Sequence, residues 1–429
     1  MKSPAMLHDR IRTAVLAERE RAERLFRQLA ECSQDRHGIT RDTYGAGENS
    51  AHDLLREYAA KDGLEVTTDA AQNTYVTWPG VNRQAPRIFI GSHLDSVPNG
   101  GNFDGAAGVI AGLIAIAALR AVGVKPACDI VTMGVRAEES VWFQVSYIGS
   151  RSALGTLPET ALDTRRVDTN RTLAKHMSAS GAQPERLRRK ERALDPPSIR
   201  AFLEVHIEQA PALVEQGFPV AICSGIPGNF RYPQSRIVGR HGHVGTPLKY
   251  RSDAAMAGAD LAMRMDAIWR EHEALGIPTA MTFGRFHTDS SVHGLTIVPG
   301  AFEFSLDVRA YDAAVLRALE ERFLAAVREV EGLRNVRFEL GRRAAAAVGL
   351  VDPVIADDLA ALATEHNVPA FRLGSPASHD AAAFAEAGVP MGMIFIRNEN
   401  GSHNPDEKME IDDFLVACTI LASWVSNNV

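Results

Sequence analysis

The chain has 429 residues, a length that usually exceeds one compact core, so we expect two domains. Its content of 45% hydrophobic and 23% charged residues is ordinary for a globular protein in water. The net charge of −7 at pH 7 argues against nucleic acid as a partner, because no long basic run offsets the acidic balance.

Cysteine spacing and apolar runs indicate the cellular compartment. The four cysteines are widely separated and form no C-x-x-C pair, so no disulfide framework is predicted. The most apolar run, 105–119, is interrupted by glycine and too short to span a bilayer. Residues 1–23 carry charges at close intervals rather than an apolar signal core. We therefore expect a cytoplasmic protein with no membrane partner.

The first half of the chain alternates predicted helices with predicted strands. Helical spacing covers 10–32, 51–61, 105–120 and 209–216, and strand-like runs cover 64–68, 74–78, 88–91, 129–135 and 201–204. This alternation favours an α/β fold, with a mostly parallel sheet covered by helices on both faces.

The order of predicted elements changes near residue 230. It becomes strand, helix, strand, strand, helix, strand, at 235–238, 253–275, 279–286, 301–309, 313–330 and 334–340. That order is typical of a ferredoxin-like βαββαβ domain. The alternation of predicted helices and strands then resumes, at 353–365, 370–373, 381–387, 391–396 and 411–426. We therefore predict a discontinuous catalytic domain, 1–228 and 345–429, interrupted by an inserted lid domain, 229–344.

Residue types that bind metals recur where the predicted strands end. These candidates are His93 with Asp95, Asp104 in a glycine-rich loop, Glu138 with Glu139, His206, and His403 after the 391–396 strand. In an open α/β sheet, ligands gather at the carboxyl ends of the strands. A single histidine is more often structural, and adjacent glutamates usually lie in a solvated loop. Their shared place at strand ends instead predicts a dinuclear metal site.

The motifs at these positions resemble those of one known family. They are Gly91-Ser92-His93-Leu94-Asp95, Gly100-Gly101-Asn102-Phe103-Asp104-Gly105, Ala137-Glu138-Glu139-Ser140, Gly149-Ser150-Arg151, His206-Ile207-Glu208-Gln209, Asp307-Val308-Arg309, Ser378-His379-Asp380-Ala381 and Ser402-His403-Asn404-Pro405. From about residue 38 to 407 the chain is similar to the hydantoinase/carbamoylase branch of the dinuclear zinc-peptidase-like amidohydrolases. This branch includes N-carbamoyl-L-amino-acid hydrolases, allantoate amidohydrolases and β-ureidopropionases.

The resemblance implies a site for two divalent metal ions, with zinc the first choice and manganese, cobalt or nickel as alternatives. Asp104 would bridge the two ions. One ion would also be held by His93 and His403, and the other by Glu139 and His206.

The same resemblance implies roles for residues that do not bind metal. Asp95, two residues after His93, would orient that imidazole, although an aspartate there could also cap the loop. Glu138 would be the general base that takes a proton from the attacking water and returns it to the leaving nitrogen. His243, in the inserted domain, would stabilise the oxyanion.

Other residues would contact the substrate, which the resemblance implies carries a carboxylate. Arg309 would bind that carboxylate, Gln209 would contact the substrate, and His379 would line the pocket. Arginines at strand ends are often surface ion pairs, and Gln209 could simply cap a helix. Thr296 stands where family members usually carry asparagine, so we expect it to affect the choice of substrate.

These features favour hydrolysis of a C–N bond in an N-carbamoyl or ureido amino acid by a metal-activated water. An N-acyl-amino-acid deacylase or amide-conjugate hydrolase with the same centre is the alternative. A binding protein that kept the fold without activity is disfavoured, because Glu138 and all the predicted ligands are present. The resemblance also implies a homodimer formed through the lid domain.

Overall fold

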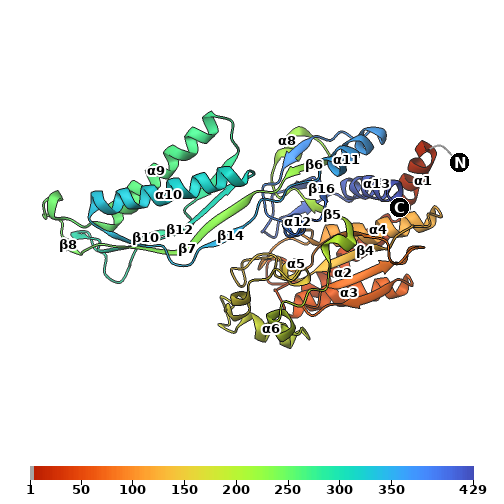
Figure 1. Cartoon of the computed structure of the whole chain (residues 1–429), viewed down its shortest axis with the longest axis horizontal. Coiled ribbons are helices and arrows are strands. Elements are labelled where there is room, and N and C mark those ends of the chain that lie inside the picture. The colour runs from red at the N-terminus through yellow and green to blue at the C-terminus, as the bar shows by residue number, and fades with distance from the viewer. Residues whose placement is uncertain (1–3) are drawn as a thin grey trace. The chain divides into compact units, whose positions relative to one another are not determined.

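The computed structural model describes residues 4–429, and its contacts divide the chain into two compact units (Figure 1). The first unit comprises the chain up to Ile226 together with Gly349–Val429, and the second comprises Pro227–Val348. The second unit is therefore an insertion in the first.

The first unit is built on an eight-stranded sheet with the order β1-β2-β4-β3-β5-β16-β6-β15. Its strands are β1 (Glu65–Thr68), β2 (Thr74–Trp78), β3 (Arg87–His93), β4 (Ile130–Val135), β5 (Ile199–Ile207), β6 (Val220–Gly225), β15 (Arg372–Gly374) and β16 (Met391–Ile396). The pairs β3–β4, β3–β5, β5–β16 and β6–β15 are parallel. Every residue of β4 and β16 is buried, as expected for strands covered on both faces. The predicted mostly parallel α/β sheet is confirmed.

Helices cover both faces of this sheet. They are α1 (Pro4–Ala17), α2 (Arg19–Ser33), α3 (Ala46–Lys61), α4 (Ala106–Ala121), α5 (Ile148–Ala153), α6 (Leu173–Ala179), α7 (Pro184–Arg188), α8 (Ala212–Gln216), α11 (Pro353–Glu365), α12 (Asp380–Glu386) and α13 (Ile411–Asn427). Helix α4 is apolar on all sides because it lies between β3 and α13. On the opposite face, Phe384 of α12 stacks on Phe202 of β5. A two-stranded ladder of β17 (Asn398–Glu399) and β18 (Lys408–Met409) completes the unit.

The inserted unit has an antiparallel sheet with helices on one face (Figure 1). Its elements are β7 (Gly228–Val238), β8 (Gly242–His243), α9 (Ala254–Ala274), β9 (Thr279–Thr282), β10 (Phe286–Thr288), β11 (Ile297–Val298), β12 (Ala301–Ala310), α10 (Ala313–Arg334), β13 (Arg337–Glu339) and β14 (Ala344–Ala346). The strand order β10-β12-β7-β13 places the first and third strands of the predicted βαββαβ pattern side by side. Burial alternates along β12, so one face of this strand packs under α9 and α10.

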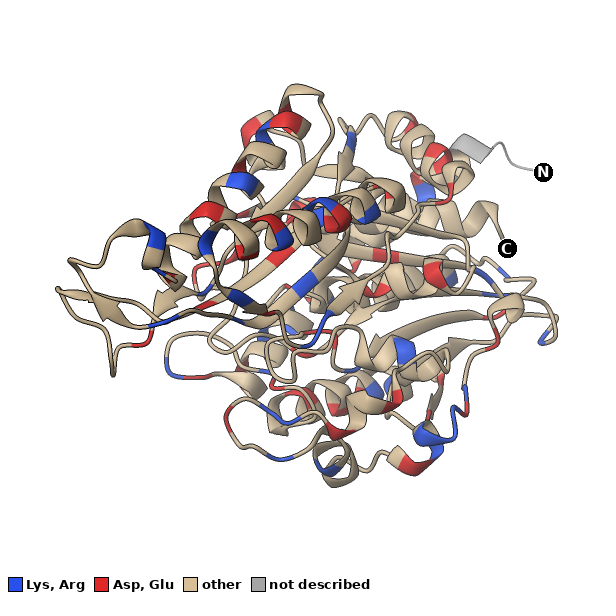
Figure 2. Ribbon diagram, turned by 60° about the vertical axis from the view of Figure 1, so that its left-hand side comes forward, with Lys and Arg blue, Asp and Glu red and all other residues tan. Residues whose placement is uncertain are grey.

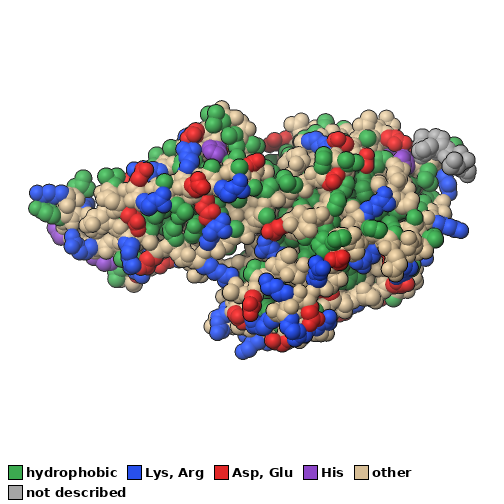
Figure 3. Space-filling view, viewed as in Figure 1, with side chains coloured by type: hydrophobic (Ala, Val, Ile, Leu, Met, Phe, Trp, Pro, Cys, Tyr) green, Lys and Arg blue, Asp and Glu red, His purple; other side chains and the backbone are tan. Residues whose placement is uncertain are grey.

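Charged side chains of both signs alternate along α9 and α10 (Figure 2). Arg264 illustrates the pattern, since it pairs with Asp260 on its own helix and with Glu329 on α10. Opposite charges are also mixed on the face shown in Figure 3. In the arginine-rich segment 186–192, Arg186 pairs with Glu191 and both side chains are partly exposed, as on a solvated face.

Several element boundaries differ from the sequence predictions for local reasons. The predicted helix 10–32 is two helices, because the chain breaks at Glu18: α1 packs mainly on α4 and α13, and α2 packs mainly on α3. Helix α8 begins at Ala212 rather than at Gln209, which has a left-handed φ of 64°. The sequence analysis did not identify α5, α6, α7 or β6 as elements. Within residues 4–429, no helix combines the length and apolar character that crossing a bilayer requires.

Close packing of α4 on the sheet generates a stability prediction. A Cβ at Gly108 would lie 2.3 Å from the Val205 carbonyl oxygen and 2.7 Å from Ser92 Cβ. Gly108→Ala should therefore destabilise the protein by about 1–3 kcal/mol in urea unfolding, because backbone must move to admit the methyl group. Gly332→Ala is the matched control: this exposed glycine of α10 has open space around its Cβ position among the described residues. There, alanine should stabilise by about 0.5–1 kcal/mol. Equal effects of the two substitutions would contradict the prediction.

Candidate metal centre

Two buried histidines and one aspartate meet at the carboxyl end of the sheet. His93 is the last residue of β3, and His206 lies near the end of the adjacent parallel strand β5. The Nε2 atoms of both imidazoles lie 3.3 Å from Asp104 Oδ1. Each of the three residues offers a ligand atom within 4.8 Å of the others.

The orientation of both imidazoles is set by hydrogen bonds at their other nitrogen. His93 Nδ1 donates to the carbonyl oxygen of Asp95 at 3.0 Å, and His206 Nδ1 donates to that of Ile207 at 2.9 Å. A proton held on Nδ1 would leave the Nε2 lone pair to a metal ion when one binds. Both imidazoles therefore present a ligand atom toward Asp104.

A second group uses the other oxygen of the same aspartate. His403 Nε2 lies 3.5 Å from Asp104 Oδ2 and 3.5 Å from Glu139 Oε1. These three residues also fall within 4.8 Å of one another. Asp104 is thus shared by two groups of donors, as a bridging carboxylate would be.

This arrangement corrects the predicted pairing of ligands. The resemblance paired His93 with His403 and Glu139 with His206, whereas the structure groups His93 with His206 and Glu139 with His403. The reason is strand order: β3 and β5 are neighbours in the sheet, so their terminal histidines lie together. The loop after β16 carries His403 to the other side of Asp104.

The charges of the site fit bound cations. Burial raises the pKa of Glu138 and Glu139 well above the usual value, and raises that of Asp380 to about 8. Burial also opposes charging of His93, but hydrogen bonds to Asp104 and Asp95 outweigh it and raise the pKa of that imidazole. Buried carboxylates in such excess need either protons or metal ions. Imidazole nitrogens with carboxylate oxygens are donors that suit zinc and related divalent ions.

Asp95 links the two groups of donors. Its Oδ1 accepts a hydrogen bond from the backbone nitrogen of Glu138 at 3.0 Å, and its Oδ2 accepts one from that of Glu139 at 3.2 Å. The Thr43 hydroxyl donates to Oδ2 at 2.6 Å. Since His93 Nδ1 lies 3.4 Å from Oδ1, one buried carboxylate touches a ligand histidine and the glutamate loop together.

The backbone is strained where it presents these side chains. Ala137, Gln209 and His403 have φ values of 59°, 64° and 61°, a region that costs energy for residues with a side chain. The buried Glu48 holds the turn before Glu138, because its carboxylate accepts a hydrogen bond from the nitrogen of Ala137 at 2.8 Å. Strained residues of this kind concentrate at functional sites.

Comparison with known proteins places this geometry in a family. Residues 89–427 match the profile of Peptidase family M20/M25/M40. The chain belongs to this family. It is 34% identical over 406 residues to an N-carbamoyl-L-amino acid amidohydrolase of Geobacillus stearothermophilus, covering 93% of this chain and 96% of that protein. It is 30% identical over 395 residues to a ureidoglycolate hydrolase of Arabidopsis thaliana, covering 90% and 81%.

A solved structure indicates the branch of the family to which the chain belongs. The crystal structure of a hydantoinase/carbamoylase family amidase from Burkholderia ambifaria superposes with a TM-score of 0.78 at 27% identity, covering 95% of this chain and 96% of that one. The chain is therefore an M20 amidohydrolase of the hydantoinase/carbamoylase branch, a hydrolase that acts on C–N bonds. The resemblance stated from the sequence motifs is confirmed. The buried clusters around Asp104 are consistent with the dinuclear metal site of this family.

Two other predicted residues of the amidohydrolase lie beside the clusters. Gln209 Nε2 donates to Asp104 Oδ2 at 2.8 Å, while its Oε1 is buried without a hydrogen-bond partner among the described residues. His379 is also buried, with its ring centroid 4.4 Å from that of His206 and its Nε2 2.7 Å from Ser375 Oγ. Burial, with His206 nearby, lowers the pKa of His379 well below the usual value, so this imidazole is neutral.

Three predicted residues belong to the inserted unit. His243 is exposed in β8, opposite Ile297 of β11, and Thr296 is exposed beside it. Arg309 lies near the end of β12 and pairs with Asp307, Nη2 to Oδ2 at 3.2 Å. Strand β12 separates them: its eight steps from Ala301 to Arg309 span about 27 Å at the usual rise. The structure therefore brings His243 and Thr296 together at the two-stranded β8–β11 ladder and places Arg309 near the far end of β12, in the larger sheet.

The sequence analysis did not give functional weight to Ser402 and Glu407. Ser402 Oγ donates to Asp104 Oδ2 at 2.5 Å and lies 2.7 Å from Glu407 Oε2. Glu407 Oε1 accepts hydrogen bonds from the backbone nitrogens of Phe103 at 2.8 Å and Asp104 at 3.2 Å. Together they tie the loop that carries His403 to the loop that carries Asp104. Their only sequence signal is the Ser402-His403-Asn404-Pro405 motif, which contains Ser402 and lies two residues before Glu407.

Double substitutions distinguish the observed pairing of ligands from the predicted one. His93→Ala with His206→Ala should leave the Asp104–Glu139–His403 group intact, so the protein should keep about one zinc ion per chain. His93→Ala with His403→Ala should damage both groups and remove all tightly bound zinc. Metal content after zinc loading and dialysis measures this, and His243→Ala is the control that should keep two ions. The opposite result for the two doubles would restore the predicted pairing.

Proposed function

We propose that this amidohydrolase cleaves the C–N bond of an N-carbamoyl amino acid or a related ureido acid at a site for two divalent ions, zinc first. The observation that carries the proposal is the sharing of Asp104 between two groups of donors beside Glu138. The names of the relatives support the substrate class, because N-carbamoyl-L-amino acids and ureidoglycolate both contain a ureido group.

Glu138 is the proposed general base. Bound divalent ions would lower the pKa of a water at the site and polarise the carbonyl under attack. The Glu138 carboxyl group is buried, and within residues 4–429 no group donates a hydrogen bond to it. It is therefore available to accept a proton from the attacking water and pass it to the leaving nitrogen. Its pKa, raised by burial, suits a group that must hold that proton between the two steps.

Gln209 supports a substrate with N–H groups. Its buried Oε1 lacks a partner although its Nε2 is held by Asp104. A buried acceptor of this kind gains a hydrogen bond when a donor arrives, and the NH₂ group of a carbamoyl substrate is such a donor. The substrate-lining role of His379 stays a prediction, since its observed contacts are with His206 and Ser375.

The inserted unit supports the proposed homodimer. His243 would stabilise the oxyanion and Arg309 would bind the substrate carboxylate, but His243 lies in the β8–β11 ladder, before the start of β12, and Arg309 lies near the far end of β12. Since the span of about 27 Å exceeds the size of a ureido acid, one copy of this unit cannot bring both to one substrate. A dimer in which the two residues come from different copies would satisfy both roles. Thr296, next to His243, would then border the substrate and influence its selection.

The substrate class can be tested directly. Zinc-loaded and manganese-loaded protein would be assayed for ammonia release from N-carbamoyl amino acids, β-ureidopropionate and allantoate. Parallel reactions would follow free amine from N-acetyl and N-aroyl amino acids. Ammonia release supports the proposal, whereas amine release from the acyl compounds alone would replace it with the deacylase alternative.

Glu138→Gln should abolish most turnover without removing the metal ions. Loss of the general base should lower kcat by about 10²–10⁴-fold, because proton transfer contributes that much to such reactions. Zinc content should stay at two ions per chain, since Glu138 belongs to neither donor group. Glu386→Gln, at the exposed end of α12, is the matched control and should keep normal kcat. Near-normal turnover of Glu138→Gln would remove this residue from the mechanism.

A further inference from the structure

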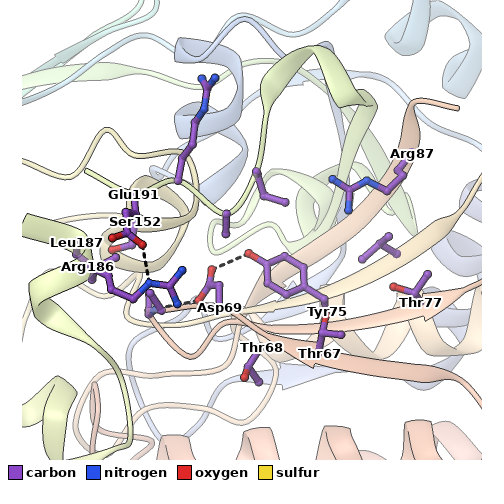
Figure 4. Close-up of a pocket in the computed structure, with 16 residues that line it drawn as sticks. Thr67, Thr68, Asp69, Tyr75, Thr77, Arg87, Ser152, Arg186, Leu187 and Glu191 are labelled. Carbon is purple, nitrogen blue, oxygen red and sulfur yellow. Dashed lines mark hydrogen bonds and ion pairs between the residues drawn. The ribbon is translucent and has the colours of Figure 1, made fainter. Parts of the chain in front are cut away.

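A separate cavity lies in the first unit, at the opposite end of the strands from the metal centre. It has a volume of about 270 Å³ and lies between the face of β1, β2 and β4 and the segment that contains Arg186 (Figure 4). Arg87, the first residue of β3, lines it, whereas His93, the last residue of that strand, is a candidate metal ligand. Six steps along the strand separate the two, a distance of about 20 Å.

The two carboxylates of the cavity are already neutralised or hydrogen-bonded. Asp69 accepts hydrogen bonds from the nitrogen of Ala71, from the nitrogen and Nδ2 of Asn73, and from the Tyr75 hydroxyl, all at 2.7–3.0 Å. Glu191 pairs with Arg186 at 2.6 Å, and Figure 4 shows both interactions as dashed lines at the cavity wall. Neither carboxylate is therefore left to serve as a counter-ion for another arginine.

Arg87 is the cation of this cavity without such a counter-ion. Its Nη2 donates one hydrogen bond to Ser198 Oγ at 3.2 Å, and its guanidinium lies 5.1 Å from the centre of the Phe89 ring. In the described part of the chain, no carboxylate lies within ion-pair distance of it. A guanidinium has five N–H donors, so most of those on Arg87 are unused. In Figure 4 its side chain extends from β3 toward Tyr75 and the cavity.

Hydroxyl groups at the cavity wall are also unused. The buried Ser152 Oγ has no hydrogen-bond partner among the described residues, which is unusual for a buried polar atom. Thr67 and Thr77 contribute further side chains from one face of β1 and β2, in register with and next to Tyr75. The cavity thus combines a guanidinium that has no carboxylate partner with unused hydroxyl groups, beside the hydrogen-bonded Asp69 carboxylate.

We propose that this cavity is a second ligand site, distinct from the metal centre, that binds a small molecule carrying a carboxylate or phosphate group on Arg87. A planar guanidinium matches both oxyanions, because it can donate two parallel hydrogen bonds. A cavity of about 270 Å³ has room for a small molecule rather than for a macromolecule.

The test is calorimetric titration of the metal-loaded enzyme with inorganic phosphate and, separately, with acetate and glycolate. Arg87→Gln should weaken the binding of the preferred oxyanion tenfold or more, as expected for loss of a charge-assisted contact. Thr77→Phe keeps every arginine but fills part of the cavity, and it should weaken the same binding. Arg83→Gln is the matched control, because Arg83 pairs with Glu65 and does not line the cavity.

The wild type and the three variants would share any binding of an anion at the metal centre. The binding that Arg87→Gln removes is therefore the contribution of the cavity. Circular dichroism and melting would show that each variant is folded. Tighter binding of phosphate than of the carboxylates, or the reverse, identifies the ligand class. Binding that survives either Arg87→Gln or Thr77→Phe unchanged, or no binding of any oxyanion to the wild type, overturns the proposal.

Discussion

The candidate centre depends on one shared carboxylate, that of Asp104. Its Oδ1 faces the histidines that end β3 and β5, and its Oδ2 faces His403. The position of this aspartate is fixed from its own backbone, because Glu407 accepts the hydrogen bond of its N–H group. Gly105 follows it with a φ of 68°, and a Cβ there would lie 2.5 Å from the His93 ring. Only glycine lets the loop approach the imidazole so closely.

The surrounding fold stabilises an arrangement of charges that would otherwise be unfavourable. Asp95, Glu138 and Glu139 are all buried, as is Asp104, and burying carboxylates without partners is costly. Asp95 accepts hydrogen bonds from the glutamate loop and from Thr43, while Glu48 pairs with the buried Arg136 at 3.0 Å. These contacts hold the ligand side chains in place, and cations at the centre would offset the remaining negative charge.

The inserted unit is stabilised by hydrophobic packing. It has its own hydrophobic core between one antiparallel sheet and two long helices. Arg309 lies in that sheet, whereas His243 lies in the separate two-stranded β8–β11 ladder. A packed sheet does not shorten, so the length of β12 that separates the β8–β11 ladder from Arg309 is a fixed property of the unit. The same rigidity of strands separates the cavity at Arg87 from the metal ligands at the other end of β3. Distance along a strand thus keeps sites with different ligands apart.

The sequence by itself determined the alternation of strands and helices, the inserted βαββαβ order and the side chains that gather around Asp104. These signals are local, since periodicity and strand-end position depend on neighbouring residues. Only the tertiary structure decided that His93 groups with His206, because that depends on β5 lying beside β3 although more than a hundred residues separate them. The same holds for the Ser402–Glu407 contacts and for the cavity at Arg87, whose residues come from distant segments. Contacts between distant segments leave no periodic pattern in a single sequence, so the folded chain alone reveals them.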